Sequence, residues 1–259
     1  METILSCENV TKKFVNLVAV NDLSFTIRKN TITSLIGPNG AGKSTTLNLV
    51  TGVDSVTSGT VYFNGTDISR MRKTELVRQG VSRTYQNVRL FHTNQLTVLD
   101  NVKIGMHNKY DSGFWQNAFA LGGSKNKEKE IAEKAEHILD YLKIGHLKHT
   151  AVTSLSFGIQ RLVELARALA AEPSLLILDE PAAGLNDAET DKLAHLLTEL
   201  RERGITILLV EHHMGLVMNI SQRVIVLHYG TKLADGTPEE IKANDEVVKA
   251  YLGEEAQHA

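Results

Sequence analysis

The chain has 259 residues, a formal net charge of -2 and 42% hydrophobic residues, as expected for a globular protein with one large or two small domains. The small net charge excludes a strong basic bias toward nucleic acid, and the single cysteine, Cys7, excludes an internal disulfide. No basic segment followed by an apolar stretch opens the chain, so no signal peptide is expected. Apolar runs such as 205–210 are too short to span a bilayer, so we expect any role at a membrane to depend on a partner.

The N-terminal part of the chain reads as short strands. Loosely alternating apolar residues predict strands over 4–10, 18–20 and 23–27, and 60–63 is followed by Asn64 and Gly65, a pair typical of a β-hairpin turn. We therefore expect an antiparallel β portion here.

Residues 37–45 form a G-x-x-x-x-G-K-[ST] phosphate-binding loop, with a predicted strand (32–36) before it and a helical pattern (45–50) after it. Its glycines allow a tight turn that points backbone N–H groups inward, toward a β-phosphate at the helix N-terminus. Lys43 can reach the β- and γ-phosphates, and the Ser44 hydroxyl can ligate Mg²⁺. The alternative is a glycine-rich turn with a surface lysine. The predicted nucleotide contacts in this loop are Gly37, Pro38, Asn39, Gly40, Ala41, Gly42, Lys43, Ser44 and Thr45.

Two isolated residues have open interpretations. Phe14, in an expected loop between the first strands, either stacks on a nucleotide base or is a partly buried loop aromatic. Gln86 follows a predicted strand (81–85) and is either a turn residue or a ligand for a metal or water.

From about residue 97 to 170 the pattern becomes helical. Helical spacing covers 97–106 and 127–142, whereas 107–126, which contains Trp115, reads as an irregular insertion. Charged residues over 125–130 indicate a solvated face. Another helix opens at 154–160, where Ser156 is either a simple N-cap or, with the Gly158 N–H, a second anion-binding helix N-terminus.

Four large apolar residues at 175–178 predict a strand buried on both faces, as in a parallel sheet. Two carboxylates follow, where α/β sheets bind ligands. After a phosphate loop, Asp179 is expected to hold Mg²⁺, directly or through water, and Glu180 to act as general base. The alternative is a strand that ends in a solvated acidic turn.

The C-terminal part continues the alternation of helices and strands. Asn186 and Glu189 predict a capping box for a helix that runs to about residue 203. A buried strand over 205–210 is followed by Glu211, His212 and His213, and one of the two histidines either donates to a γ-phosphate oxygen or is only a polar loop residue. We expect a strand over 224–227, a turn over 235–238, short terminal helices and a disordered tail over 254–259.

The order of these motifs resembles that of the ABC-transporter ATP-binding cassette over essentially the whole chain. The resemblance implies an α/β P-loop NTPase core, RecA-like with a mainly parallel sheet, together with an N-terminal antiparallel β subdomain and an inserted α-helical subdomain. The single ABC ATPase domain would comprise a core (1–95 and 172–253), the helical subdomain (96–171) and a tail (254–259).

The family also implies roles for single residues. Phe14 would stack on adenine, and Gln86 would touch Mg²⁺ and the attacking water and sense a membrane partner. Ser156 and Gly158 match the signature motif. The implied catalytic residues are Glu180, His212, Gln86 and Lys43, and the implied metal ligands are Ser44, Gln86 and Asp179.

Within the family, 83–91 and the 107–126 insertion look like the branched-chain amino acid importer ATPases. The chain departs from the usual family pattern in having Phe157 and Ile159 in the signature and Asn186 in the interface loop, where Asp is usual. The ATPase of the lipopolysaccharide exporter is a near relative, and a soluble cluster-assembly ATPase is the other alternative.

The resemblance implies ATP and Mg²⁺ as cofactors and a head-to-tail dimer with an identical or sister ATPase. Further partners would be two transmembrane permease subunits, which the insertion is hypothesised to contact, and, indirectly, an extracytoplasmic solute-binding protein; no nucleic acid is expected. The chain would lie peripherally on the cytoplasmic face of a bacterial-type inner membrane.

Overall fold

The computed structural model describes residues 2–86, 88, 90–91, 96–106 and 124–255, with the backbone alone at 124–127 and 252–255. The chain forms two compact units, one of residues 1–76 and 174–259 and one of residues 77–173. The predicted insertion at 107–123, with Trp115, lies outside the described residues. Residues 124–126, which were expected to be irregular, begin a helix.

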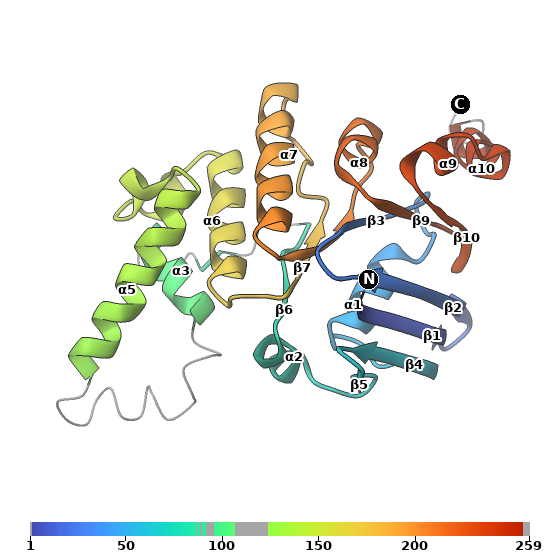
Figure 1. Ribbon diagram of the computed structural model, residues 1–259, viewed down its shortest axis with the longest axis horizontal. Coiled ribbons are helices and arrows are strands. Elements are labelled where there is room, and N and C mark those ends of the chain that lie inside the picture. Colours follow the sequence, from blue (N-terminus) through green and yellow to red (C-terminus); the bar gives the residue numbers. More distant parts are fainter. Residues whose placement is uncertain (1, 87, 89, 92–95, 107–123, 256–259) are drawn as a thin grey trace. The chain divides into compact units, whose positions relative to one another are not determined.

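The first unit contains an antiparallel sheet with the strand order β2-β1-β4-β5 (Figure 1). Its strands are β1 (Thr3–Phe14), β2 (Leu17–Arg28), β4 (Ser58–Phe63) and β5 (Thr66–Asp67). The antiparallel portion predicted from the sequence is confirmed. Asn64 and Gly65 connect β4 and β5 at φ 47° and 77°, the left-handed conformation that a two-residue hairpin turn of this kind needs. Phe14 was expected in a loop, but it is the last residue of β1 and pairs with Leu17, because the strand pairing continues to the hairpin tip.

A second, mainly parallel sheet holds the core of this unit. Within the unit its strand order is β10-β9-β3-β8-β7, in which β3, β7, β8 and β9 are parallel and β10 pairs antiparallel with β9. All residues of β3, β7 and β8 are buried, which agrees with the large apolar residues that predominate in these strands. The bounds are β3 (Ile32–Ile36), β7 (Leu175–Asp179), β8 (Thr206–Val210), β9 (Arg223–His228) and β10 (Thr231–Gly236).

Strand β10 was not predicted. Asp235 and Gly236, which were expected in a turn, are its last two residues, and Thr237 then caps the next helix. The strand was missed because the sequence of β10 shows no alternation of apolar and polar residues. An edge strand can lack this alternation, because one of its sides faces solvent.

Helices cover both faces of the mainly parallel sheet. Helix α1 lies on the face next to the antiparallel sheet, and α7, α8 and α9 lie on the other (Figure 1). On that second face, Ile36 of β3 and Val224 and Val226 of β9 pack with Val217 of α8 and Ile241 of α9. The helices are α1 (Lys43–Val50), α7 (Asp187–Glu202), α8 (Met214–Ile220), α9 (Pro238–Lys242) and α10 (Asp245–Glu255), and α2 (Lys73–Gln79) runs across the boundary between the units.

The ends of these helices show where the sequence predictions hold. The capping box of Asn186 and Glu189 at the start of α7 is confirmed. Helix α1 begins at Lys43, two residues earlier than predicted. Helix α10 continues to Glu255, so the first two residues of the expected tail are helical, whereas 256–259 lie outside the described residues.

The second unit is built from helices. Helix α3 packs against both α5 and α6, and a Cβ at Gly105 of α3 would collide with the Arg167 carbonyl of α6, so the two helices approach closely there. Ala135 and Leu139 of α5 are fully buried, as the apolar pattern predicted. The elements are β6 (Val81–Arg83), α3 (Val98–Met106), α5 (Ser124–Tyr141), the 3-10 helices η2 (Gly145–Leu147) and η3 (Val152–Ser154), and α6 (Phe157–Leu169).

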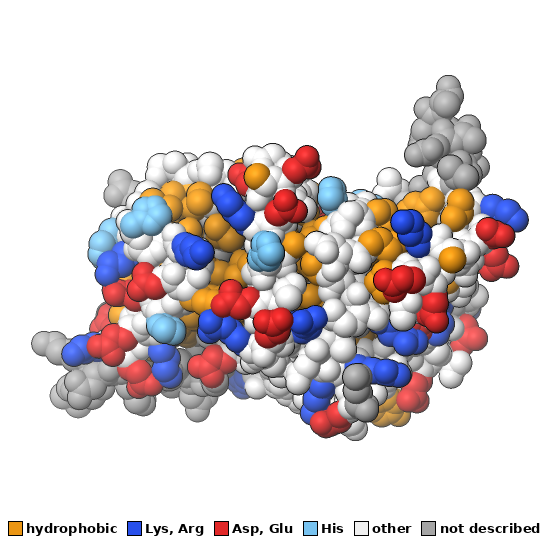
Figure 2. Space-filling view, turned by 45° about the horizontal axis from the view of Figure 1, so that its top comes forward, with side chains coloured by type: hydrophobic (Ala, Val, Ile, Leu, Met, Phe, Trp, Pro, Cys, Tyr) orange, Lys and Arg blue, Asp and Glu red, His pale blue; other side chains and the backbone are white. Residues whose placement is uncertain are grey.

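The surface carries charges of both signs. On the face drawn in Figure 2, lysine and arginine side chains alternate with aspartate and glutamate side chains, in keeping with the net charge of -2. Of the helices in the described part of the chain, none has the length and apolar content needed to cross a bilayer.

Candidate functional site

The phosphate loop connects β3 to α1. The backbone turns at Gly37, Gly40 and Gly42, with φ of 149°, 79° and 98°. A Cβ at Gly42 would lie 2.7 Å from the Ala19 carbonyl oxygen of β2, too close for a Cβ atom unless the backbone shifts. The loop therefore needs glycine for two reasons, its left-handed conformation and its contact with a neighbouring strand.

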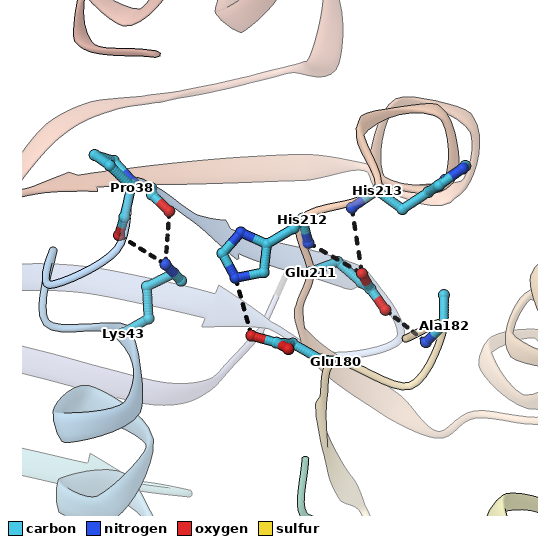
Figure 3. A network of polar contacts seen from close by, with 8 residues as sticks. Pro38, Lys43, Glu180, Ala182, Glu211, His212 and His213 are labelled. Carbon is cyan, nitrogen blue, oxygen red and sulfur yellow. Dashed lines mark hydrogen bonds and ion pairs between the residues drawn. The ribbon is translucent and has the colours of Figure 1, made fainter. Parts of the chain in front are cut away.

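Lys43 is buried, with 7% of its surface exposed. Its ammonium turns back toward the phosphate loop (Figure 3). Its Nζ donates hydrogen bonds to the carbonyl oxygens of Gly37 at 2.6 Å and Pro38 at 2.8 Å. No acidic residue lies in the first turn of α1, so no carboxylate of that turn offsets the positive end of the helix dipole. This arrangement favours a polyanion such as a nucleotide triphosphate.

Two carboxylates lie at the carboxyl end of β7, which is separated from β3 by β8. Asp179 is the last residue of β7 and is 6% exposed. Glu180 has a φ of 51°, which is unusual for a residue other than glycine, and its N–H donates to the Val210 carbonyl of β8 at 2.8 Å. Strained backbone of this kind is concentrated at functional sites.

The two histidines after β8 have different roles in the structure. The Nε2 of His212 lies 2.9 Å from the Oε1 of Glu180, and its ring points toward that carboxylate (Figure 3). His213 points the other way, and its Nδ1 accepts a hydrogen bond from the Leu216 N–H at the start of α8. The geometry therefore separates His212, which contacts Glu180, from His213, which caps α8; the residue pattern left this choice open, and the family resemblance pointed to His212.

Sequence reasoning missed Glu211, although this residue is at the centre of the network. Its carboxylate is 3% exposed and accepts hydrogen bonds from backbone N–H groups, at 2.6 Å from Ala182, 3.0 Å from His212 and 3.3 Å from His213 (Figure 3). The one available signal was an acidic residue directly after a fully apolar strand, in the same position relative to β8 as Glu180 has relative to β7.

Gln86, Ser156 and Gly158 lie in the second unit. Gln86 is exposed, and its backbone carbonyl accepts a hydrogen bond from Arg161 of α6 at 3.3 Å. Ser156 holds the N-cap position of α6, as predicted, but its hydroxyl makes no capping hydrogen bond, and Gly158 lies in the first turn. The ring of Phe157 is under the Arg161 guanidinium at 4.8 Å.

In the first unit, by contrast, the structure brings several predicted residues together. The phosphate loop, Asp179, Glu180 and His212 all follow the carboxyl ends of the adjacent strands β3, β7 and β8. Phe14 lies at the tip of the β1–β2 hairpin, 40% exposed, with the Lys12 ammonium 4.8 Å from its ring centre.

Comparison with known proteins gives consistent matches. The family model for ABC transporters matches residues 20–183, and the model for the branched-chain amino acid ATP-binding cassette transporter matches residues 231–257. The chain is 40% identical over 252 residues to the high-affinity branched-chain amino acid transport ATP-binding protein BraF of Pseudomonas aeruginosa, covering 97% of this chain and 98% of BraF.

Two solved structures are also similar. The ADP conformation of MJ1267, an ATP-binding cassette of an ABC transporter, superposes with a TM-score of 0.85 at 34% identity, covering 98% of this chain and 100% of that one. The dimeric post-hydrolysis state of the cassette MJ0796, bound to ADP and Pi, has a TM-score of 0.77 at 27% identity, covering 91% and 99%. The chain belongs to the ABC transporter family, as a nucleotide-binding cassette with the P-loop NTPase fold and ATPase activity.

Proposed function

We propose that the chain is the ATP-hydrolysing subunit of an importer for branched-chain amino acids or related small solutes. The observation that carries this proposal is the match of residues 231–257 to a C-terminal model specific to branched-chain amino acid cassettes, together with the similarity to BraF over nearly the whole chain. We also propose the division into a nucleotide-binding core (1–95 and 172–253) and a helical subdomain (96–171).

Hydrolysis would use groups of the first unit. Lys43 would leave the Gly37 and Pro38 carbonyls to bind the β- and γ-phosphates, with the backbone N–H groups of residues 39–45 around them. Glu180 would take a proton from the attacking water, and His212, held 2.9 Å from it, would orient that carboxylate and donate to a γ-phosphate oxygen. Phe14 would stack on adenine through its exposed ring.

We propose that Mg²⁺ arrives with the nucleotide. Mg²⁺ is commonly bound by one or two protein oxygens together with substrate phosphates, and the Ser44 hydroxyl and the Asp179 carboxylate, both in the first unit, are oxygen donors of this type. The role of Gln86, in the second unit, stays a prediction from the family resemblance. The ion would neutralise charge that develops on the phosphates.

We further propose that two cassettes act together, because the MJ0796 cassette is dimeric in its post-hydrolysis state. Ser156 and Gly158, at the N-terminus of α6, would contact the γ-phosphate held by Lys43 of the partner cassette. The partner would be a second copy or a sister ATPase. Two membrane-spanning permease subunits would hold the dimer at the cytoplasmic face of the membrane, with Gln86 responding to them, and a solute-binding protein would supply the substrate indirectly.

Affinity purification of the chain from detergent-solubilised membranes tests this proposal. We expect two membrane-spanning subunits to copurify and the reconstituted complex to couple ATP hydrolysis to uptake of leucine, isoleucine or valine by vesicles. A complex that contains only soluble partners, or one that moves lipopolysaccharide outward, would contradict it. A Lys43→Ala complex, assembled equally well, is the matched control for uptake that depends on ATP.

A further inference from the structure

We propose that Glu211 is a positioning residue that holds the Glu180 and His212 side chains in their 2.9 Å contact. The inference rests on the proposed function, in which these two residues act on the attacking water and the γ-phosphate. Glu211 would touch neither, since all of its recorded contacts are with backbone N–H groups.

The position of Glu211 links the two loops that carry the reacting groups. Its Oε1 accepts from the Ala182 N–H at 2.6 Å, two residues after Glu180 in the loop that follows β7. Its Oε2 accepts from the His212 N–H at 3.0 Å and the His213 N–H at 3.3 Å, in the loop that follows β8. One buried side chain thus ties the backbone of the Glu180 loop to the backbone of His212 (Figure 3).

The loop that follows β7 needs such a contact to hold the backbone of Glu180 in place. Glu180 has a left-handed backbone (φ 51°), a conformation that persists only where surrounding contacts enforce it. The Glu180 N–H is fixed by the Val210 carbonyl at 2.8 Å, and the Glu180 carbonyl accepts from Ala183 at 3.2 Å. The Ala182 N–H donates to Glu211 at 2.6 Å, which is shorter than either of these two bonds. Removing it would let the loop relax and would move the Glu180 carboxylate away from His212.

The chemistry of this tie requires a carboxylate. Both Glu211 oxygens accept hydrogen bonds, and a glutamine of the same length has one acceptor oxygen and one NH₂ donor. In Glu211→Gln, the NH₂ group must therefore face the backbone N–H of either Ala182 or His212. Two donors then face each other, and that hydrogen bond is lost. The substitution keeps the shape of the side chain, which separates the effect of the tie from that of packing.

Steady-state ATP hydrolysis by the full chain tests the proposal. We expect Glu211→Gln to lower kcat by about 10- to 100-fold, because small misplacements of reacting groups have effects of this size, with KM and ATP affinity within about twofold of wild type. Glu240→Gln is the control. Glu240 also accepts a hydrogen bond from a backbone N–H, that of Thr237 at 2.8 Å, but it lies at the cap of α9. The kcat of the Glu240→Gln protein should equal that of the wild type. Equal losses in kcat, nucleotide affinity and melting temperature would show a merely structural role and overturn the proposal, as would an unchanged kcat.

A second measurement needs no variant and so does not depend on whether Glu211→Gln folds. In ¹H–¹⁵N spectra of the wild-type chain, a short hydrogen bond to a carboxylate should give the Ala182 amide proton a strong downfield shift and slow exchange with solvent. Fast exchange at Ala182, comparable to exposed loop amides, would overturn the proposal. If Glu180→Gln retained hydrolysis, the proposed catalytic role itself would fail; if Glu180→Gln were inactive and Glu211→Gln fully active, only the positioning role would fail.

Discussion

His212 and Glu180 contact each other through Nε2 and Oε1 at 2.9 Å, although 32 positions separate them in the sequence. The contact follows from the pairing of β7 and β8, in which Asp179 lies opposite Val210. Each residue comes shortly after its strand ends, so the parallel register places both on the same edge of the sheet. Because the register also sets which side chains are buried in β7 and β8, the site and the core are fixed by the same pairing.

Glu180→Gln should leave ATP bound but uncleaved. The amide cannot accept a proton from water, so we expect hydrolysis to fall by 10²- to 10⁴-fold, the usual contribution of a general base. With the γ-phosphate retained, a dimer should accumulate, which size-exclusion chromatography with light scattering would detect at saturating Mg-ATP. Glu239→Gln, on the exposed side of α9, is the control. A Glu180→Gln protein that stayed monomeric would contradict the dimer mechanism.

Lys43→Ala should weaken nucleotide binding strongly while leaving the fold in place. The buried ammonium is the positive group that the phosphate loop offers, and the carbonyls of Gly37 and Pro38 that it now bonds would then turn to water. We expect at least a tenfold rise in the Kd for ATP, measured by titration calorimetry, with a small change in melting temperature. Lys242→Ala, an exposed change in α9, should bind ATP normally.

Asp100 should make stability depend on pH in the acid range. Partial burial by itself raises the pKa of this carboxyl, but hydrogen bonds from the Thr97 hydroxyl (2.6 Å) and N–H (3.0 Å), with the charges of Lys103 and His149, outweigh it and lower the pKa. A pKa below the unfolded value of about 3.9 means that the stabilisation is present above that pH and is lost as the pH falls through the folded pKa.

Asp100→Asn tests this expectation in urea unfolding at pH 7 and at pH 3. Asp100 and Thr97 bond each other reciprocally at the start of α3, so the substitution should cost about 1 kcal/mol at pH 7 and much less at pH 3. Asp191→Asn, an exposed change on α7, should have little effect at either pH. An equal loss at both pH values would contradict the assignment.

Cys7 should be inert in the folded protein. It is 2% exposed in β1, and burial raises the pKa of its thiol, so little thiolate is available as a nucleophile. A disulfide exchange reagent such as dithiobis-nitrobenzoate should react with it only after unfolding in urea. Rapid reaction of the native chain would show that β1 opens readily from the sheet.

The sequence was most informative where a structure depends on residues that are close together in the chain. The strands expected over 32–36, 175–178 and 205–210 agree with β3, β7 and β8 within a residue, because strands buried on both faces are rich in large apolar residues. The capping box at Asn186 was also predicted correctly, since both of its partners lie within one helical turn.

The structural features that were missed depend on contacts between distant segments. Edge strand β10 has mixed composition, and Phe14 belongs to β1 only because pairing with β2 reaches the hairpin tip. The carboxylate of Glu211 gains its importance from Ala182, 29 residues away. The capping contact of His213 with the Leu216 N–H was also not predicted, whereas His212 had been chosen through the family resemblance.

The crowding at Gly42 has a consequence for reading mutational data. A variant that adds a methyl group there would clash with the Ala19 carbonyl before any nucleotide is present, so a screen for soluble, folded protein would reject it. The effect of a substitution at Gly42 on activity therefore combines an effect on folding with an effect on catalysis. Glu180→Gln, which keeps the size and shape of the side chain, is a substitution with which a survey of variants can measure the demand for ATP turnover separately.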